Sequence, residues 1–289
     1  MDRAIADRAT GSAAESASSV AGSPCIAAVA SCGIAVMAKA SVPGLTKTRL
    51  VPPLTHEQAA ALNTAFLQDV TGNMLLAASQ AAPHASIAGY AAYGPPRSEE
   101  FFRRHFSPSI GLIEAWLPNF GDCLYHAICT ILARGHAAAV VLNADSPTLP
   151  TALLNETAEV LAQPGDRAVL GPSIDGGYYL LGLKAAHRRM FEDIAWSTAR
   201  VAEETRERAH EIGLELHPMW YDIDDSETLR RLHGELRLFE AAGMRPAAVE
   251  RGVALHHARH TAELFNRLWP DGEFTRGRQD VVQTEKAGV

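Results

Sequence analysis

Short apolar runs alternate along this chain with longer segments that carry apolar residues at helical spacing. The runs suit buried strands and lie at about 33–38, 85–92, 111–117, 137–143, 167–171, 177–183 and 214–220. The helical patterns lie at about 55–80, 121–134, 150–162, 197–212 and 226–242. Thr55 and Gln58 form a capping box that starts the first helix. This alternation predicts an α/β fold with a mostly parallel central sheet and helices on both faces, in which 137–143 is a central strand.

The rest of the chain sets the boundaries of that domain. Residues 1–30 are rich in Ala, Ser and Gly and predict a disordered leader, because they lack the compact apolar segment of a signal peptide. The main domain is expected at 31–245, a helical extension at 246–270 and a flexible tail at 271–289. In the extension, Phe265, Leu268 and Trp269 have the spacing of one helical face.

Composition excludes several classes of protein. The formal net charge of −7 argues against a general nucleic-acid binder. No apolar run reaches the roughly 18 to 20 residues of a membrane-spanning helix, so we expect a cytoplasmic protein without a membrane span. The 4 cysteines show no CxxC spacing, which favours reduced thiols over a disulfide or zinc framework.

Cations gather in the loop after the first predicted strand. Ligands of such sheets bind where strands end, so the residues that follow each strand are the candidates for a site. Here Lys39, Lys47 and Arg49 surround a turn that contains Pro43 and Gly44. Arginine can grip a phosphate with two hydrogen bonds and lysine acts as a point charge. An exposed basic loop is the alternative, but the arrangement suits a polyphosphate.

Carboxylates follow the other strands. Asp145 comes directly after the central strand, where it would suit Mg²⁺ or would cap the helix that begins near Pro150. Asp222 and Asp224 point to one side of an extended segment and repel each other unless a cation lies between them. We expect Asp225 or Ser226 to cap the next helix, which leaves Asp222 and Asp224 to complete a metal site with Asp145.

The segment 171–177, Gly-Pro-Ser-Ile-Asp-Gly-Gly, has two interpretations. Its glycines allow a ligand to approach the backbone, and Ser173 and Asp175 could hydrogen-bond that ligand. A plain hairpin turn is the alternative, since Asp-Gly between strands is a strong turn signal. We favour ligand contact because the other candidate loops converge on this edge of the sheet.

Five ordered motifs between about residues 33 and 240 carry a resemblance to a known family. They are Lys39 with Pro43–Leu50, Ala144–Pro150, Gly171–Leu180, Trp196-Ser197-Thr198 and Asp222-Ile223-Asp224. This set resembles the radical-SAM/selenodomain-associated transferase 1 family, whose members are glycosyltransferase-A-like. A more distant similarity, through Lys47–Leu50 and the helix after it, is to the phospholactate and phosphoenolpyruvate guanylyltransferases.

The resemblance implies the Rossmann-like fold of nucleotide-diphospho-sugar transferases and a set of roles for the residues. Mg²⁺ (or Mn²⁺) would lie on Asp145, Asp222 and Asp224, and Lys39, Lys47 and Arg49 would contact the triphosphate. The other nucleotide-binding or substrate-binding positions would be Gly44, Thr48, Ser146, Ser173, Asp175, Gly176, Gly177, Trp196, Ser197 and Thr198. Among these, Trp196, Ser197 and Thr198 would line the acceptor side. The segment 171–177 departs from the guanylyltransferase pattern, so the acceptor is left open.

Three functions are compatible with these residues. The first is transfer of a nucleotidyl group from an NTP to a small phosphorylated or phosphonate acceptor, with release of pyrophosphate. The second is glycosyl transfer from a nucleotide-sugar, although such enzymes carry Asp-x-Asp after the central strand where this chain has Asn143-Ala144-Asp145. The third is a non-catalytic nucleotide-binding protein. The expected partners are the nucleotide and a small acceptor, with a homodimer as one open oligomeric state.

Overall fold

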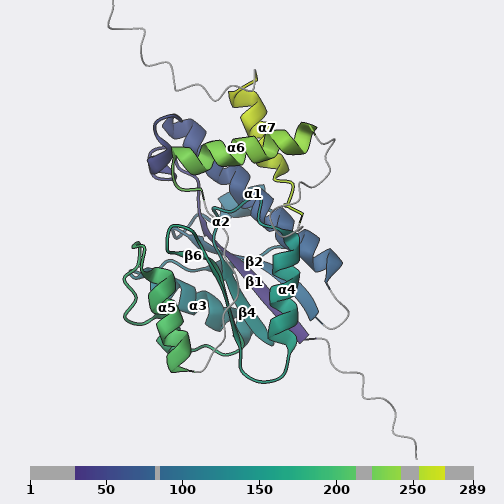
Figure 1. The fold of residues 1–289 in the computed structure, drawn as a ribbon, viewed down its shortest axis with the longest axis vertical. Helices are drawn as coiled ribbons and strands as arrows, with labels where there is room; N and C mark the ends of the chain where they lie inside the picture. Colours follow the sequence, from purple (N-terminus) through teal and green to yellow (C-terminus); the bar gives the residue numbers. More distant parts are fainter. Residues whose placement is uncertain (1–29, 82–84, 213–222, 242–253, 271–289) are drawn as a thin grey trace, which may run out of the picture.

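A computed structural model describes residues 30–81, 85–212, 223–241 and 254–270 of the chain. A 6-stranded sheet forms its centre, flanked by helices (Figure 1). The strands are β1 (Ala30–Lys39), β2 (Ala85–Gly94), β3 (Gly111–Glu114), β4 (Ala138–Leu142), β5 (Ala168–Pro172) and β6 (Tyr178–Leu183).

The helices occupy the intervals between the strands and the C-terminal part of the chain. They are α1 (His56–Gln80), α2 (Glu99–His105), α3 (Phe120–Ala133), α4 (Thr151–Ala162), α5 (Val201–Glu211), α6 (Ser226–Ala241) and α7 (Arg259–Leu268), with 3-10 turns η1 (Thr48–Leu50) and η2 (Arg188–Phe191). The capping box of α1 is confirmed, because the Gln58 amide donates to Thr55 Oγ1 and the Thr55 amide donates to Gln58 Oε1. None of the helices in the described ranges is both long and apolar enough to cross a membrane.

The strand order is β3-β2-β1-β4-β6-β5. β1 pairs in parallel with β2 and with β4, and β2 pairs in parallel with β3. β6 is antiparallel to both of its neighbours. The chain therefore leaves β1 toward one edge of the sheet and returns to its other side for β4. The carboxyl ends of β1 and β4 lie where the strand order reverses, which is the usual position of a ligand in open α/β sheets.

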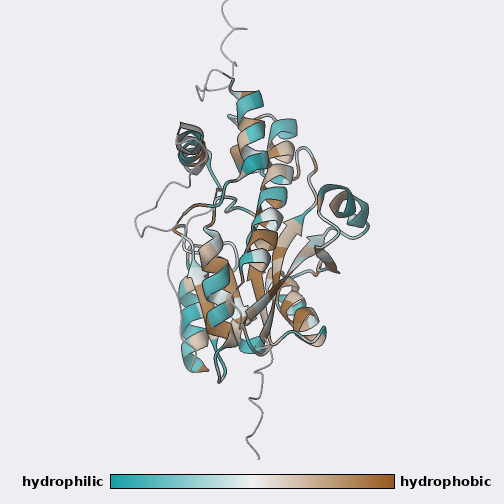
Figure 2. Ribbon diagram, turned by 90° about the vertical axis from the view of Figure 1, so that its right-hand side faces the viewer, coloured by the Kyte–Doolittle hydropathy of each residue, from teal (hydrophilic) through white to brown (hydrophobic). Residues whose placement is uncertain are grey.

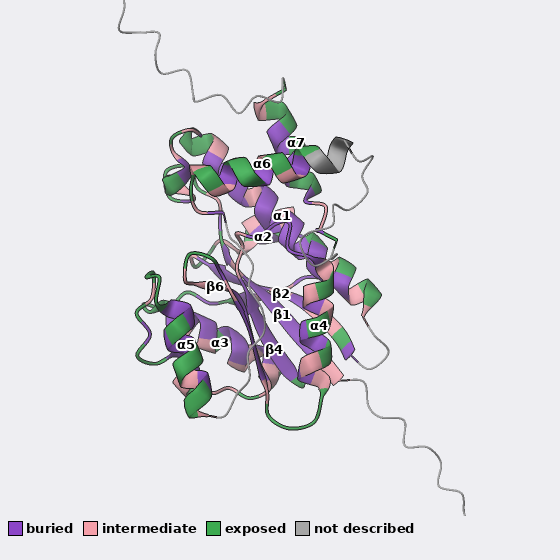
Figure 3. Ribbon diagram, viewed as in Figure 1, coloured by how far each residue is buried: buried purple, intermediate pink, exposed green. Residues whose placement is uncertain are grey.

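Alternate residues of the strands face two separate apolar layers. In β1, Ile34 and Val36 contact the layer made with α1, α2 and α4, whereas Ala35 belongs to the layer made with α3, α5 and η2. This follows from the two-residue period of a strand. The apolar strands lie between more polar outer helix faces (Figure 2), and the strands are the most buried elements (Figure 3). The predicted central strand is confirmed, since every residue of β4 is buried.

A third apolar cluster joins the C-terminal helices to the start of α1. It contains Leu50 of η1, Phe66 of α1, Ile223 and Leu229 near the start of α6, and Phe265 of α7. Figure 1 shows α6 and α7 beside the end of α1 that extends beyond the sheet. Phe265 of the extension is buried in this cluster, and Leu268 and Trp269 are partly buried against it.

Two local features differ from the pattern-based prediction. α2 was not predicted, because its seven residues are too short for a periodicity signal, and its charges form the i,i+4 pairs Arg103–Glu99 and Arg104–Glu100. β3 ends at Glu114 and leaves Trp116 and Leu117 exposed, although the apolar run predicts a strand to 117. The predicted strand at 214–220 lies outside the described residues.

The buried Asp69 of α1 holds the start of α7. Its two oxygens accept hydrogen bonds from the backbone amides of His260 (2.9 Å) and Thr261 (2.8 Å), and from the Thr261 hydroxyl (2.5 Å). The first amides of a helix have no partner within that helix, so Asp69 supplies the acceptors that they need.

We expect Asp69→Ala to lower the free energy of unfolding by about 3 kcal/mol, because it leaves these donors buried without an acceptor. Urea unfolding measures this loss. Asp69→Asn is the matched control, since it keeps the shape and one acceptor oxygen and should cost less. Equal stability of Asp69→Ala and the wild type would show that α7 is held by its apolar face alone.

Candidate functional site

A cavity of about 860 Å³ opens at the carboxyl edge of β1 and β4. Its walls come from the loop after β1, the end of β4, the β5–β6 turn, the loop before α5 and the segment before α6. Eleven of the residues that the sequence analysis selected line this cavity: Lys39, Lys47, Thr48, Arg49, Asp145, Asp175, Gly177, Trp196, Ser197, Thr198 and Asp224. The four strand-end segments that the sequence analysis selected and the motif at 196–198 all contribute described residues to this one cavity.

Hydrogen bonds from side chains to backbone carbonyls within the loop hold the loop after β1 in place. Lys39 Nζ donates to the carbonyl of Leu45 at 2.8 Å, and the buried Thr46 hydroxyl donates to the carbonyl of Val42. Gly44 has a φ of 76°, a conformation that favours glycine. Gly44 does not line the cavity. Its positive φ suits it to shape the turn, and its contact with the nucleotide stays a prediction.

Lys47 and Asp145 form an ion pair in the lining of the cavity. Lys47 Nζ lies 2.7 Å from Asp145 Oδ1, and the two side chains are 8% and 30% exposed. The same ammonium donates to the carbonyl of Ile223 at 2.9 Å and lies 5.3 Å from the centre of the Phe66 ring. Lys47 adopts a left-handed φ of 52°, so its backbone is bent to place this side chain inward. In this structure Lys47 neutralises Asp145.

Asp224 lies next to this pair. The backbone amide of Ile223 donates to the carbonyl of Asp145 at 2.9 Å, which fixes the segment before α6 against the end of β4. Burial and the neighbouring charge of Asp145 raise the pKa of Asp224, and the charge of Asp175 adds to the increase, while Lys47 and Arg49 oppose it. These effects show that three carboxylates and two cations share a small volume.

The three-carboxylate metal site is described only in part. Asp145 and Asp224 are close enough for their charges to interact, and carboxylate oxygens suit a hard cation such as Mg²⁺. Asp222 lies outside the described residues. Within the described ranges, no group of three or more His, Cys, Asp or Glu side chains is arranged to hold a metal ion.

The prediction that Asp225 caps α6 agrees with the structure, in which its Oδ1 accepts from the amides of Glu227 and Thr228.

Arg49 is exposed beside the pair. It makes no ion pair with another described residue, in contrast to Lys47. The positive charge of Arg49 opposes the increase in the pKa of Asp224. Arg49 is thus a cation of the cavity lining that a ligand can engage without breaking an ion pair with a described residue.

The segment 171–177 forms the turn of a β-hairpin, as the alternative interpretation predicts. The amide of Ser173 donates to the carbonyl of Gly177, and β5 and β6 pair on either side. Gly177 and Asp175 line the cavity, with the Gly177 amide donating to Asp175 Oδ1. The hairpin turn is therefore confirmed, and contact of Asp175 and Gly177 with a ligand stays a prediction that their place in the cavity lining allows.

For Gly176, Ser146 and Ser173, contact with a ligand stays a prediction. Gly176 has a φ of 90°, and a Cβ there would lie 2.0 Å from the carbonyl oxygen of Ala199, so glycine is required by the close approach of the next loop. Ser146 and Ser173 are buried. None of the three lines the cavity.

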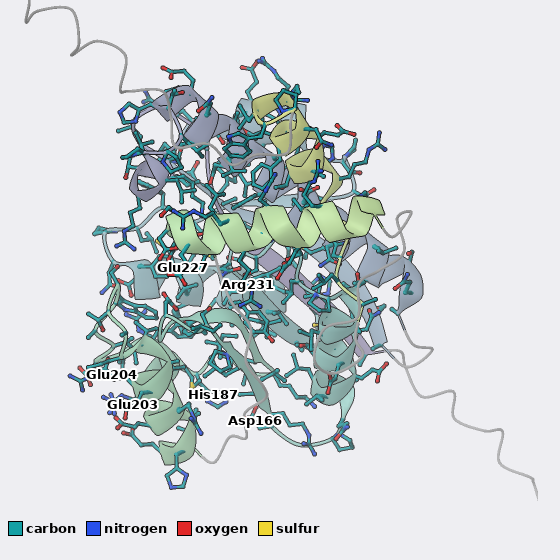
Figure 4. The ribbon with its side chains drawn as sticks, turned by 45° about the horizontal axis from the view of Figure 1, so that its top comes forward. Asp166, His187, Glu203, Glu204, Glu227 and Arg231 are labelled. Atoms are coloured by element: carbon teal, nitrogen blue, oxygen red, sulfur yellow. The ribbon has the colours of Figure 1, made fainter. Side chains whose placement is uncertain are left out.

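The loop before α5 carries Trp196 to the cavity. Glu204 of α5 is buried, accepts from the amide of Ala195 at 2.6 Å and pairs with Arg200, which anchors both ends of the loop (Figure 4). The Thr198 hydroxyl accepts a hydrogen bond from the backbone amide of Arg200, and the Thr198 carbonyl accepts one from the backbone amide of Val201. Helix α5 begins at Val201 and not at about 197 as predicted. The loop remains free to line the cavity with Trp196, Ser197 and Thr198.

Three further residues of the cavity were missed by the sequence analysis. Asn143 and Tyr178 stand at the end of β4 and the start of β6, and Phe120 starts α3. The side-chain oxygens of Asn143 and Tyr178 are buried and have no hydrogen-bond partner among the described residues. Burial raises the pKa of the Tyr178 phenol. The position of Asn143 directly after a central strand was a signal that could have selected it.

Solved structures agree with this architecture. A candidate nucleotide-diphospho-sugar transferase from Desulfovibrio desulfuricans G20 is 24% identical and superposes with a TM-score of 0.65, covering 84% of this chain and 96% of that one. The fold is that of the nucleotide-diphospho-sugar transferases. The predicted Rossmann-like α/β fold is thereby confirmed.

Two further solved structures match with lower TM-scores. A 4-diphosphocytidyl-2C-methyl-D-erythritol synthase from Anaerococcus prevotii has a TM-score of 0.46 at 8% identity, covering 72% of this chain and 96% of that one. A cytidylyltransferase from Leptospira borgpetersenii has a TM-score of 0.44 at 11% identity, covering 83% and 95%.

Sequence comparisons extend over a smaller part of the chain. The model of a family described as "Uncharacterized protein conserved in bacteria (DUF2064)" matches residues 76–198, which include Asp145, the β5–β6 turn and Trp196. Among curated proteins, no sequence matches this chain.

Proposed function

We propose that this protein is a nucleotidyltransferase that moves an NMP group from an NTP to a small acceptor and releases pyrophosphate. The observation that carries the proposal is the meeting of Lys47, Arg49, Asp145 and Asp224 in one cavity at the carboxyl edge of the sheet. Cations of the first loop would bind phosphate oxygens, and carboxylates would hold the cation that a bound triphosphate brings. Such chemistry depends mainly on alignment and charge neutralisation, which a rigid wall of this kind provides.

Each side chain of the cavity has a role in this proposal. Arg49 and Lys39 would bind the triphosphate from the loop, and Lys47 would move between Asp145 and the phosphates. Asp175 and Gly177 would contact the nucleoside, and Trp196, Ser197 and Thr198 would line the acceptor side. The motifs that these residues belong to resemble the radical-SAM-associated transferases, which supports a transferase of this class.

Asp145 and Asp224 would hold Mg²⁺, with Asp222 as the third carboxylate expected from the sequence. The hard oxygen donors of this set fit such an ion. When bound, the ion would neutralise charge that develops on the phosphate oxygens.

A glycosyltransferase is the second candidate, favoured by the similarity to the Desulfovibrio protein. Enzymes of that kind bind the diphosphate of a nucleotide-sugar with the same charges. The end of β4 favours nucleotidyl transfer in this chain, because Asn143 stands where an Asp-x-Asp pair would place its first carboxylate.

A thermal-shift panel distinguishes nucleotidyl transfer from glycosyl transfer. Each of the four NTPs and a set of nucleotide-sugars is added at about 100 times its dissociation constant, with Mg²⁺ or with EDTA. A ligand that binds the folded state should add about 2.7 kcal/mol and raise Tm by roughly 5–10 °C. We expect an NTP with Mg²⁺ to give this shift and EDTA to reduce it. A shift with nucleotide-sugars alone would favour glycosyl transfer, and no shift with any nucleotide would contradict both proposals.

A further inference from the structure

The charged side chains of the cavity lining carry more negative than positive charge. In the part of the chain that the structure describes, they are the cations Lys39, Lys47 and Arg49 and the carboxylates Asp145, Asp175, Asp224 and Asp225. Three positive charges and four negative charges leave a net charge of −1 when every group is ionised. A triphosphate entering without further positive charge would therefore meet a lining of its own sign, which Coulomb repulsion disfavours.

Two of these carboxylates serve the backbone next to them. Asp225 Oδ1 accepts from the first amides of α6, and Asp175 Oδ1 accepts from the Gly177 amide at 2.8 Å. Asp145 and Asp224 are the two whose charges act on each other. The pKa of Asp224 is raised by its burial and then by the charge of Asp145, so positive charge added beside this pair would be stabilising.

Lys47 supplies that positive charge in this structure. Its Nζ lies 2.7 Å from Asp145 Oδ1 and donates at 2.9 Å to the carbonyl of Ile223, the residue before Asp224. A carboxylate oxygen and a backbone carbonyl oxygen are also the kinds of ligand that a hard divalent cation takes. The ammonium of Lys47 is therefore engaged with oxygens that such a cation would need.

The conformation of Lys47 is unusual for a residue with this role. Its φ of 52° lies in the left-handed region, which residues other than glycine seldom adopt and which is often found at sites that change with a ligand. The Lys47 side chain is 8% exposed, whereas that of Asp145 is 30% exposed and lines the cavity. Asp145 is thus accessible to a ligand while its partner is buried behind it.

We propose that Lys47 is an internal counter-ion that prevents Asp145 from holding a divalent cation until the phosphates of a nucleotide take over the charge of Lys47. The inference rests on the proposed function and adds that the nucleotide and the cation bind only together. Lys47 releases Asp145 and contacts phosphate from the same loop as Arg49. A cation alone is rejected because Lys47 already neutralises Asp145, and a triphosphate alone is rejected because the lining is negative.

Mn²⁺ binding in the absence of nucleotide tests the role of Lys47. EPR titration of the full chain measures free Mn²⁺ and requires no turnover. A neighbouring cation changes the proton affinity of a carboxylate by about tenfold or more, and we expect an effect of this size on Mn²⁺. The wild type should therefore bind Mn²⁺ weakly, and Lys47→Met should bind it about tenfold more tightly. Lys47→Gln, which is also neutral but keeps a donor for the Ile223 carbonyl, should show the same gain and replaces Lys47→Met if that variant fails to fold.

Two further variants show whether the gain comes from the ion pair. Arg49→Met is the matched control, because it removes a cation of the same lining that has no ion pair with a described residue. Its gain in Mn²⁺ affinity should be much smaller. Lys47→Met combined with Asp145→Asn should lose the gain, since the carboxylate that Lys47 releases is then absent.

Calorimetric titration of an NTP tests the second half of the proposal. The NTP with the largest thermal shift is titrated into the wild type in Mg²⁺ and in EDTA, and we expect its affinity to be at least about tenfold weaker in EDTA. Lys47→Met should bind this NTP with Mg²⁺ more weakly than the wild type does, although it binds Mn²⁺ alone more tightly. A purely structural lysine would not change the two affinities in opposite directions.

Several results would overturn the proposal. They are unchanged Mn²⁺ affinity in the Lys47 variants, an equal gain in Arg49→Met, a gain that persists without the Asp145 carboxylate, and equal NTP affinity of the wild type in EDTA and in Mg²⁺. Failure of the proposed function is seen separately, as absence of nucleotide binding to the wild type, because the Mn²⁺ titrations contain no nucleotide.

Discussion

Asp145→Asn is expected to remove the effect of Mg²⁺ on nucleotide binding and to lower turnover by about 100-fold or more. The substitution keeps the shape of the side chain but removes the charge that Lys47 neutralises at 2.7 Å and that raises the pKa of Asp224. The fold should persist, since Asp145 is 30% exposed and its backbone contact with Ile223 does not involve the side chain. Calorimetric titration of NTP with and without Mg²⁺ measures the change in affinity.

Asp166→Asn is the matched control for this experiment. Asp166 pairs with His187 at 2.6 Å on the protein surface and does not line the cavity (Figure 4). It should bind nucleotide with the affinity of the wild type. An Asp145→Asn variant that keeps the full response to Mg²⁺ would exclude Asp145 from a metal site and assign it to the ion pair with Lys47 alone.

Lys47→Met and Arg49→Ala are expected to weaken NTP binding by about tenfold or more each, for different reasons. Lys47 is 8% exposed and makes two polar contacts, so its loss leaves Asp145 without its partner. We expect Lys47→Met to lower the free energy of unfolding by about 1–2 kcal/mol as well. Arg49 is exposed and unpaired within the described residues, so Arg49→Ala should leave stability unchanged.

The two variants are compared by calorimetry for affinity and by urea unfolding for stability. A loss of stability without a loss of NTP affinity in Lys47→Met would make Lys47 a purely structural partner of Asp145. If NTP affinity were unchanged in both variants, the loop after β1 would be a solvated surface, and the proposed function would lose its phosphate site.

Much of the fold followed from local patterns. Buried strands such as β4 are continuous apolar runs, and the helices between them carry periodic apolar residues and a capping box at Thr55. These signals are local because the period of a strand or helix is set by the backbone itself. α2 escaped detection since seven residues span less than two helical turns, too few for a period to be recognised.

Only some of the residues that the sequence analysis selected for the candidate site line the cavity. Lys47, Arg49, Asp145 and Asp224 were selected because strand ends meet at one edge of a parallel sheet, and they do line one cavity. Gly44, Gly176, Ser146 and Ser173 do not line it, so their contact with a ligand stays a prediction. Phe120 was missed because its position depends on where α3 starts in space, which its neighbours in sequence do not specify.

By itself the sequence determined that this chain is an α/β protein with cations after its first strand and carboxylates after the others, because strand and turn propensities act over a few residues. The tertiary structure decided which of those charges form ion pairs with each other. Lys47 and Asp145 are 98 positions apart in the sequence and become partners only because β1 and β4 are adjacent in the sheet. The contacts of Trp196 with Phe120 and Tyr178 likewise join the loop before α5 to α3 and β6, whose proximity results from packing on one face of the sheet.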